Sequence, residues 1–306
     1  MSKQSKISKQ LKKYVLFLPL LLLLLIVTSA CSNNGDTSDG DSNQETAEDD
    51  KLAEIKKAGK LVLGTSPDFP PFEFYVLNDS NQKEIVGSDI SLAQAIADEI
   101  GVDLEIKATD FNGVLANIQT GSVDLGISGF AKTEARADVM DFSEGYQQEV
   151  SDGYQGIIVP KAAVDKYKTL DDLKNAEITI GAQGGSIQYE IAQKLTSETN
   201  IKQYGTTDAA IMALDSGDID AVTVSTSSAS QVISSFPDLT ILPKDGFDLD
   251  SDNVYGTNVV GFPKDDNNKS FIDLVNKVIQ DNKGNGNIEK WKDEAKAQST
   301  EAIDAE

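Results

Sequence analysis

The chain reads TGSVDLGIS at residues 120–128 and SGDIDAVTV at residues 216–224, and the similarity of these two stretches indicates how the chain folds. In each, a glycine ends an expected helix, a tight turn follows, and an apolar strand begins after an aspartate. Short β-rich runs alternate with amphipathic helical patterns in the rest of residues 51–306, which is typical of α/β proteins with largely parallel sheets. The repeat therefore predicts two similar α/β lobes, although ordinary turns between helices and strands could produce the match by chance.

The segments around the first copy have the alternation that such a lobe needs. Residues 60–65 and 102–106 are expected strands, and residues 91–101 are an expected helix whose apolar side chains recur at four-residue spacing. Close to the C-terminus, residues 271–279 carry a helical apolar face that needs a surface to pack on.

The first 31 residues resemble a bacterial lipoprotein signal. Five lysines precede an apolar run at residues 14–27, which is shorter than the roughly 20 residues of a membrane span. Small residues then lead to Cys31, the only cysteine, which is expected to carry the lipid and become the mature N-terminus. A simple secretory signal is the alternative, because Thr28 stands where a leucine is usual. Residues 32–50 carry seven acids and no base, so we expect a flexible tether there.

The composition excludes several classes of function. The net charge is −23, and it becomes −28 without the five signal lysines, since 22 bases then face 50 acids. Such a charge argues against nucleic acid and anionic membrane surfaces as partners. The chain has no histidine and no cysteine after Cys31, so histidine bases, histidine metal ligands and disulfides within the body are excluded.

A calcium loop is the one metal site that the sequence suggests. Asp248, Asp250 and Asp252 have the spacing of the start of an EF-hand loop. Asn253 and Val259 stand where glycine and glutamate are needed, so we expect a solvated acidic loop and no bound metal.

Arg136 is the only arginine of the chain and follows the expected end of a buried strand. A planar guanidinium can grip a carboxylate or phosphate with two parallel hydrogen bonds, which a lysine cannot do. The alternative is a surface charge or an internal ion pair in a chain that otherwise uses lysine.

Several short motifs, in the same order along the chain, resemble the polar amino-acid binding proteins of bacterial ABC importers (extracellular solute-binding family 3). The motifs are GKLVLGT at 59–65, DFPPFEF at 68–74, VGSDI at 86–90, TDFNG at 109–113, ISG at 127–129, TEAR at 133–136, DFS at 141–143, GAQGGS at 181–186 and DAV at 220–222. Together they cover essentially all of residues 53–298.

The resemblance implies a periplasmic-binding-protein-like type II fold, in which two α/β lobes joined by two crossover strands close over a ligand by a hinge motion. Lobe 1 would contain about residues 51–150 and 255–306, and lobe 2 about residues 151–254. The implied function is non-enzymatic. A monomer, lipid-anchored on the extracytoplasmic face of the bacterial cell membrane, would deliver a small polar amino acid to an ABC permease without a cofactor.

Two other functions stay open. A few relatives in this family act as dehydratases on small carboxylates, and here only carboxylates, lysine or tyrosine could supply the acid or base. The third possibility is a sensor or adhesin whose cleft is vestigial.

The resemblance also assigns ligand-binding residues. Arg136 falls on the arginine that grips the ligand's α-carboxylate. Ser128 and Gly129, at the expected carboxyl end of a strand, would add polar contacts. Phe69 and Phe111 match the aromatic positions that enclose the ligand's side chain. An ordinary turn and ordinary core aromatics are the alternatives.

A helix start in lobe 2 would add to the same site. Ser186 follows two glycines and Ile187 begins an expected helix, whose free amides favour an anion. This turn is not a nucleotide-binding loop, because no lysine followed by serine or threonine comes after the glycines.

The chain departs from the family pattern at the expected ammonium site. Ser225 stands where the family usually has an aspartate that pairs with the ligand's ammonium group. Either Asp68, Asp110 or another acid substitutes for it, or the ligand is not a standard α-amino acid. Ala131 replaces a common hydroxyl residue in the same site.

Overall fold

The computed structural model describes residues 50–148 and 153–303. The predicted signal with its lipidated Cys31 and residues 32–49 of the predicted tether lie outside these ranges. Within the described residues, no helix is both long and apolar enough to cross a membrane.

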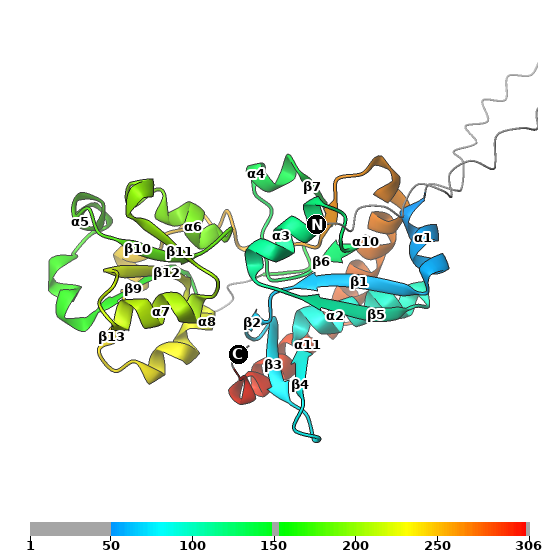
Figure 1. The fold of residues 1–306 in the computed structure, drawn as a ribbon, viewed down its shortest axis with the longest axis horizontal. Coiled ribbons are helices and arrows are strands. Elements are labelled where there is room, and N and C mark those ends of the chain that lie inside the picture. The colour runs from blue at the N-terminus through cyan, green and yellow to red at the C-terminus, as the bar shows by residue number, and fades with distance from the viewer. Residues whose placement is uncertain (1–49, 149–152, 304–306) are drawn as a thin grey trace, which may run out of the picture. The chain divides into compact units, whose positions relative to one another are not determined.

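The first of two five-stranded sheets contains segments from both ends of the folded chain (Figure 1). Its strands, in spatial order, are β5 (Asp103–Ala108), β1 (Lys60–Thr65), β6 (Leu125–Gly126), β15 (Gly261–Pro263) and β7 (Met140–Phe142). β1 is parallel to β5 and β6, whereas β15 is antiparallel to β6 and β7.

The second sheet has the same arrangement, strand for strand. Its strands, in spatial order, are β11 (Ile201–Tyr204), β10 (Ile180–Gln183), β12 (Ala221–Ser225), β9 (Gln155–Pro160) and β13 (Leu239–Ile241). β10 is parallel to β11 and β12, and β9 is antiparallel to β12 and β13. The prediction of an α/β fold with two similar units is confirmed.

The repeated sequence occupies equivalent places in the two sheets. It follows α3 (Phe111–Gln119) in the first case and α7 (Thr207–Asp215) in the second. Gly121 and Gly217 turn the chain with φ values of 65° and 81°, which favour glycine.

An aspartate completes each copy of the repeat. Asp124 Oδ2 accepts the Val62 N–H at 2.8 Å, and Asp220 Oδ2 accepts the Thr179 N–H at 2.9 Å. Each aspartate therefore attaches the start of its strand to the neighbouring strand segment, which explains why both copies carry this residue.

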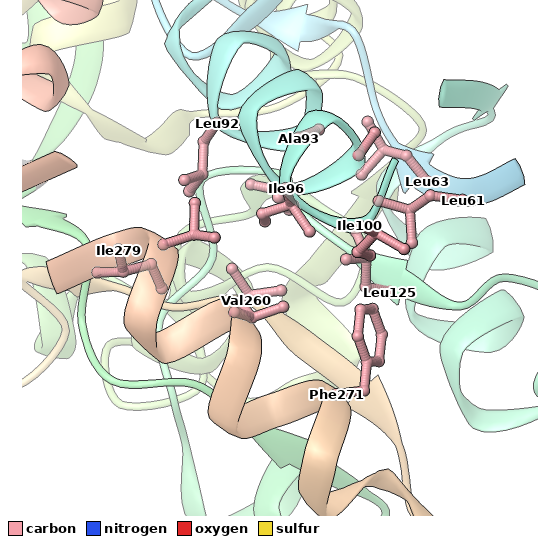
Figure 2. Packing of buried hydrophobic residues seen from close by; sticks show 14 of the residues in the cluster. Leu61, Leu63, Leu92, Ala93, Ile96, Ile100, Leu125, Val260, Phe271 and Ile279 are labelled. Carbon is pink, nitrogen blue, oxygen red and sulfur yellow. The ribbon is translucent and has the colours of Figure 1, made fainter. Parts of the chain in front are cut away.

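Helices α2 (Ser88–Ile100) and α10 (Lys269–Gly284) pack together over the first sheet, as Figure 2 shows. The predicted apolar face of the C-terminal helix lies in this core: Phe271 and Ile279 belong to the same cluster as Leu92 and Ile96 of α2, and Phe271 lies beside Leu125 of β6. Asp50, the last residue assigned to the tether, is part of this body, because its carboxylate caps α1 (Lys51–Ala58) and accepts the Ser270 hydroxyl.

The second sheet is buried on both faces. Ile157 and Val159 of β9 point into one apolar cluster, which includes Leu173 of α5 (Leu170–Asn175). Ile158 points into another, which includes Leu214 of α7. Successive side chains of a strand face opposite sides, so an unbroken apolar run is needed here.

The chain passes from the first sheet to the second and back, and the described parts of the two passages pair. β8 (Gln147–Gln148) is antiparallel to β14 (Thr257–Asn258).

A three-stranded sheet precedes α2 and contains β2 (Asp68–Phe69), β3 (Glu73–Leu77) and β4 (Lys83–Val86). The remaining helices are α4 (Glu134–Ala137), α6 (Ile187–Ala192), α8 (Thr226–Val232), α9 (Lys244–Phe247) and α11 (Asn287–Gln298).

Candidate functional site

A cavity of about 30 Å³ is lined by residues of the three-stranded sheet, by residues next to the first five-stranded sheet, and by residues of β10 and α6 at the second. The lining residues are Asp68, Phe69, Glu73, Phe111, Ser128, Gly129, Phe130, Ala131, Arg136, Gln183, Ser186, Ile187 and Gln188. A cavity needs roughly 10–15 Å³ to hold one water molecule, so this cavity has room for about two. An amino acid is much larger, and binding one would require the surrounding residues to separate.

Arg136 lies in this cavity and is only 5% exposed, so the alternative of a surface charge is wrong. Its backbone N–H is held by the Thr133 hydroxyl, which caps α4. Nη1 donates to the Ala131 carbonyl at 2.6 Å, and Nη2 donates to the Gly185 carbonyl at 2.9 Å. The guanidinium thus contacts backbone next to the first sheet and backbone next to the second.

Aromatic rings surround the guanidinium. Its carbon lies 5.4 Å from the centroid of Phe111 and 5.8 Å from that of Phe130. The two rings meet edge to face at 6.3 Å, and Phe69 stacks on Phe72 at 5.1 Å. Cations are attracted to such ring faces, so the site can hold positive charge as well as aliphatic carbon.

Ser128 and Gly129 are fixed in place by the residues around them. The Ser66 N–H donates to Ser128 Oγ at 3.0 Å. Gly129 has a φ of 55°, and a Cβ at this position would lie 2.8 Å from a ring carbon of Phe69. Only glycine meets both conditions without displacing the Phe69 ring.

Asp68 is a carboxylate of the cavity with neutral partners. Gln183 Nε2 donates to its Oδ2 at 2.7 Å, and the Ser66 hydroxyl donates to its Oδ1 at 2.8 Å. Burial raises the pKa of the Asp68 carboxyl to about 6, although the Ser66 hydrogen bond acts in the opposite direction. At neutral pH this carboxyl is therefore mostly ionised and sensitive to a cation placed next to it.

The second sheet contributes neutral groups. Ser186 caps α6, accepting the Tyr189 N–H at 3.2 Å and donating to the Gln183 carbonyl at 2.7 Å. The Gln188 side chain donates to Gln155 Oε1 at 2.9 Å. Ile187 adds an apolar wall to the cavity.

Two predicted site residues do not line the cavity. The Asp110 carboxylate caps α3 by accepting the Gly113 N–H at 2.7 Å. Ser225 ends β12, and its hydroxyl shares a hydrogen bond of 2.9 Å with Ser227. Of the three positions considered for the ammonium group, only Asp68 faces the cavity.

Four lining residues were not predicted: Glu73, Phe130, Gln183 and Gln188. Glu73 lies inside the DFPPFEF motif and Gln183 inside the GAQGGS motif, so proximity to the motifs was the available signal. Phe130 directly follows Gly129, but its apolar side chain reads equally well as core.

No group of three or more acidic or cysteine side chains is placed to hold a metal ion in the described residues. In the acidic loop, Asp250 accepts the backbone N–H groups of Val254 and Tyr255, both at 2.9 Å. Asp250 thereby stabilises the loop itself.

Residues 61–170 match the family described as Bacterial extracellular solute-binding proteins, family 3. The arginine-binding extracellular protein ArtP of Bacillus subtilis is 30% identical over 236 residues, which cover 76% of this chain and 84% of ArtP. The L-cystine-binding protein TcyJ of Escherichia coli is 24% identical over 249 residues, 80% of this chain and 87% of TcyJ.

Solved structures extend the match to the fold. The amino acid ABC transporter substrate-binding protein AbpA of Streptococcus pneumoniae, bound to L-arginine, is 37% identical, with a TM-score of 0.69. The match covers 81% of this chain and 98% of AbpA. An ancestral arginine-binding protein, solved with arginine and with glutamine, is 29% identical, with a TM-score of 0.63 over 77% of this chain and 97% of its own.

Proposed function

Because this chain belongs to the bacterial extracellular solute-binding proteins of family 3, we propose that it captures a cationic amino acid, first of all L-arginine, for an ABC permease. The relatives that it matches are amino-acid binding proteins, which supports the general role. The observation that carries the proposal is a buried guanidinium, Arg136, in one cavity with the ionisable Asp68.

The charges of the cavity suit a ligand with one carboxylate and additional positive charge. Arg136 would bind the α-carboxylate, and the faces of Phe69 and Phe111 would enclose the side chain. Asp68 would balance a ligand cation. The strongly negative chain also attracts cations from a distance and repels acidic amino acids.

We assign the role of the family's aspartate, which Ser225 replaces in this chain, to Asp68 rather than to Asp110. Asp68 lines the cavity, whereas Asp110 is used by α3 and does not. A neutral hydroxyl at position 225 can then take part in the site only after a rearrangement. We therefore assign the positive charge of the ligand to Asp68.

Ligand binding would separate residues that now touch. The Arg136 guanidinium contacts the Gly185 carbonyl, and the Gln183 amide contacts Asp68. Both contacts join a residue next to the first sheet to one next to the second. The ligand would replace them, and the two lobes, about residues 51–150 with 255–306 and about residues 151–254, would hinge at β8 and β14.

We further propose that the protein is a monomer held on the extracytoplasmic face of the cell membrane by a lipid on Cys31. Labelling with a radioactive fatty acid tests the anchor. The label should appear on the wild-type chain and be absent from Cys31→Ser, and equal labelling of both would contradict it.

Calorimetry on the chain from residue 32 onward, freed of bound metabolites by unfolding and refolding, tests the function. L-arginine should bind at least about 100-fold more tightly than L-glutamate, a difference of about 2.7 kcal/mol. Agmatine, which is arginine without its carboxylate, should bind far more weakly than arginine. Absence of heat and of thermal stabilisation with all common amino acids would overturn the proposal. Turnover of prephenate or arogenate would favour the alternative of a dehydratase.

A further inference from the structure

Two buried carboxyl groups contact the segment that follows β6. Glu73 lies on β3, and Asp89 lies in the first turn of α2; both are fully buried. The Ser128 hydroxyl donates to Glu73 Oε1 at 2.8 Å, and the Gly129 N–H donates to Asp89 Oδ2 at 2.8 Å. Each carboxyl therefore holds one of two consecutive residues that line the cavity.

Neither carboxyl forms an ion pair with a cation of the described residues. None of the ion pairs formed by the described residues includes Glu73 or Asp89. The other donors to Asp89 are neutral, namely the Tyr146 hydroxyl at 2.8 Å and the Gln147 amide at 3.4 Å. Two adjacent buried carboxylates repel each other so strongly that one of them keeps a proton at neutral pH.

The partners of the two carboxyls indicate which of them carries the proton. The side chains of Glu73 and Asp89 interact with each other, and a hydrogen bond between two carboxyl groups requires a proton on one of them. Asp89 accepts N–H and O–H bonds that stabilise its charge, and burial raises its pKa only to about 6. Burial, followed by the charge of Asp89, raises the pKa of Glu73 well above its usual value. Its Oε2 reaches no donor among the described residues, as expected of an oxygen that is itself protonated.

Two further charged groups face the pair. Asp68 on β2 adds a negative charge that also raises the pKa of Glu73. Arg136 lines the same cavity as Glu73. Tyr146, directly before β8, is the remaining titratable group in contact with Asp89.

We propose that Glu73 and Asp89 share one proton and act as positioning residues for the ligand. Neutral Glu73 donates to Asp89 and accepts from Ser128, while ionised Asp89 holds Gly129 and Tyr146. Loss of the proton puts two negative charges side by side and displaces the Ser128–Gly129 segment. The ligand in this proposal is that of the proposed function, whereas the shared proton is independent of it.

The variant Glu73→Gln tests the coupling to binding, because its amide can donate to Asp89 and accept from Ser128 as the neutral acid does. We expect its affinity for L-arginine at pH 7 to stay closer to that of wild type than the affinity of Glu73→Ala, whose side chain can do neither. Above the pKa of the pair, the wild type should lose affinity by up to about tenfold per pH unit and Glu73→Gln should not.

The quantity to compare is the ratio of the two dissociation constants, since the titration of arginine itself affects both proteins equally. Glu84→Gln, an exposed change on β4, is the matched control and should follow the wild type at every pH. Equal losses for Glu73→Gln and Glu73→Ala at pH 7, or parallel profiles for wild type and Glu73→Gln at every pH at which both proteins stay folded, would overturn the proposal.

An infrared difference spectrum of the unliganded proteins tests the proton directly. Wild type minus Glu73→Gln at pH 7 should show the carbonyl stretch of a protonated carboxylic acid. Asp89→Asn, which replaces the proposed acceptor of the proton, should shift the frequency of this band and serves if Glu73→Gln does not fold. Absence of the band while arginine still binds would refute the shared proton and leave the proposed function standing. A band in a protein that does not bind arginine would refute the proposed function and leave the shared proton standing.

Discussion

The two sheets have the same strand order and the same aspartate clamp, in which Asp124 or Asp220 accepts a backbone N–H of the neighbouring strand segment. The side chains that the two sheets bring to the cavity differ. The first sheet and its small neighbour supply the charged and aromatic groups, among them Arg136, Asp68 and Phe111. The second supplies amides, a hydroxyl and an apolar wall, among them Gln183 and Ser186. An equal topology therefore places equivalent strand ends at the site without making them chemically equivalent.

Recognition of the ligand depends on the side chains at the strand ends rather than on the strand order. The fold decides which strand ends can reach a ligand, and the few residues after each strand decide the chemistry. We expect the charged half to define the ligand class, and the neutral half to complete the enclosure. Substitutions in matched positions of the two halves test this division.

The largest effect is expected from Arg136→Ala. It removes the proposed partner of the ligand's carboxylate, so the affinity for L-arginine should fall by more than about 100-fold, or about 2.7 kcal/mol. Arg136→Lys keeps the charge but loses the fork and should still lose at least about tenfold. Calorimetry measures both.

The matched change in the second half is Gln188→Ala, for which we expect a loss below about tenfold. Lys132→Ala, an exposed cation near Arg136, should leave the affinity unchanged. If Gln188→Ala weakened binding as much as Arg136→Ala, the division between a charged and a neutral half would be wrong.

The two aspartate clamps should differ in their contribution to stability. Asp124→Ala is expected to cost about 2 kcal/mol and Asp220→Ala about 1 kcal/mol, as measured by urea unfolding. The reason is that Asp124 is partly buried and also contacts Lys51 at 2.8 Å, whereas Asp220 is exposed. An equal or larger cost for Asp220→Ala would show that the second clamp matters more than its exposure suggests.

Asp68→Asn should weaken L-arginine binding about tenfold at pH 7.5, or about 1.4 kcal/mol. The same change should stabilise the unliganded protein at that pH. The pKa of Asp68 is about 6 in the folded state, against about 3.9 when unfolded. The stability that its proton provides is complete below pH 4 and is lost as the pH rises through 6.

Thermal unfolding at pH 7.5 and at pH 4 checks that sign, because the difference in stability should disappear at pH 4. Asp110→Asn is the control, since asparagine also caps helices. Its affinity should stay within about twofold of wild type. A loss with Asp110→Asn and none with Asp68→Asn would reverse the assignment of the ligand's cation.

The smallest effect concerns the two turns of the repeat. Gly121→Ala and Gly217→Ala should each cost about 1 kcal/mol, because both positions have positive φ. A Cβ would meet no atom within 4 Å at either position, so only the backbone contributes. Clearly unequal midpoints of urea unfolding would mean that the turns are not equivalent.

Sequence alone could predict the features that depend on local pattern. The helix–glycine–strand repeat, the apolar face of α10 and a special role for the single arginine are readable from spacing and composition. Two similar α/β sheets follow from them, although each sheet is half antiparallel rather than largely parallel, because one strand in each returns against its neighbours. The family resemblance supplied most of the cavity residues.

The features that depend on side-chain direction could not be predicted. Asp68 and Asp110 were equal candidates to pair with the ligand's ammonium group, yet one faces the cavity and the other caps a helix. Glu73 reads as an ordinary strand residue, and only packing places it against Asp89. Such neighbours come from distant parts of the chain, and no local pattern records their contact.

The paired crossings β8 and β14 bring the two ends of the second-sheet segment next to each other, since Gln148 is opposite Thr257. A segment with adjacent ends is a natural cassette, because exchanging it need not disturb the host around it. The segment of a relative that corresponds to residues 153–254 could thus replace those residues here without a change at Arg136. Such a chimera would take its preference for ligand charge from this chain and the neutral half of its cavity from the relative.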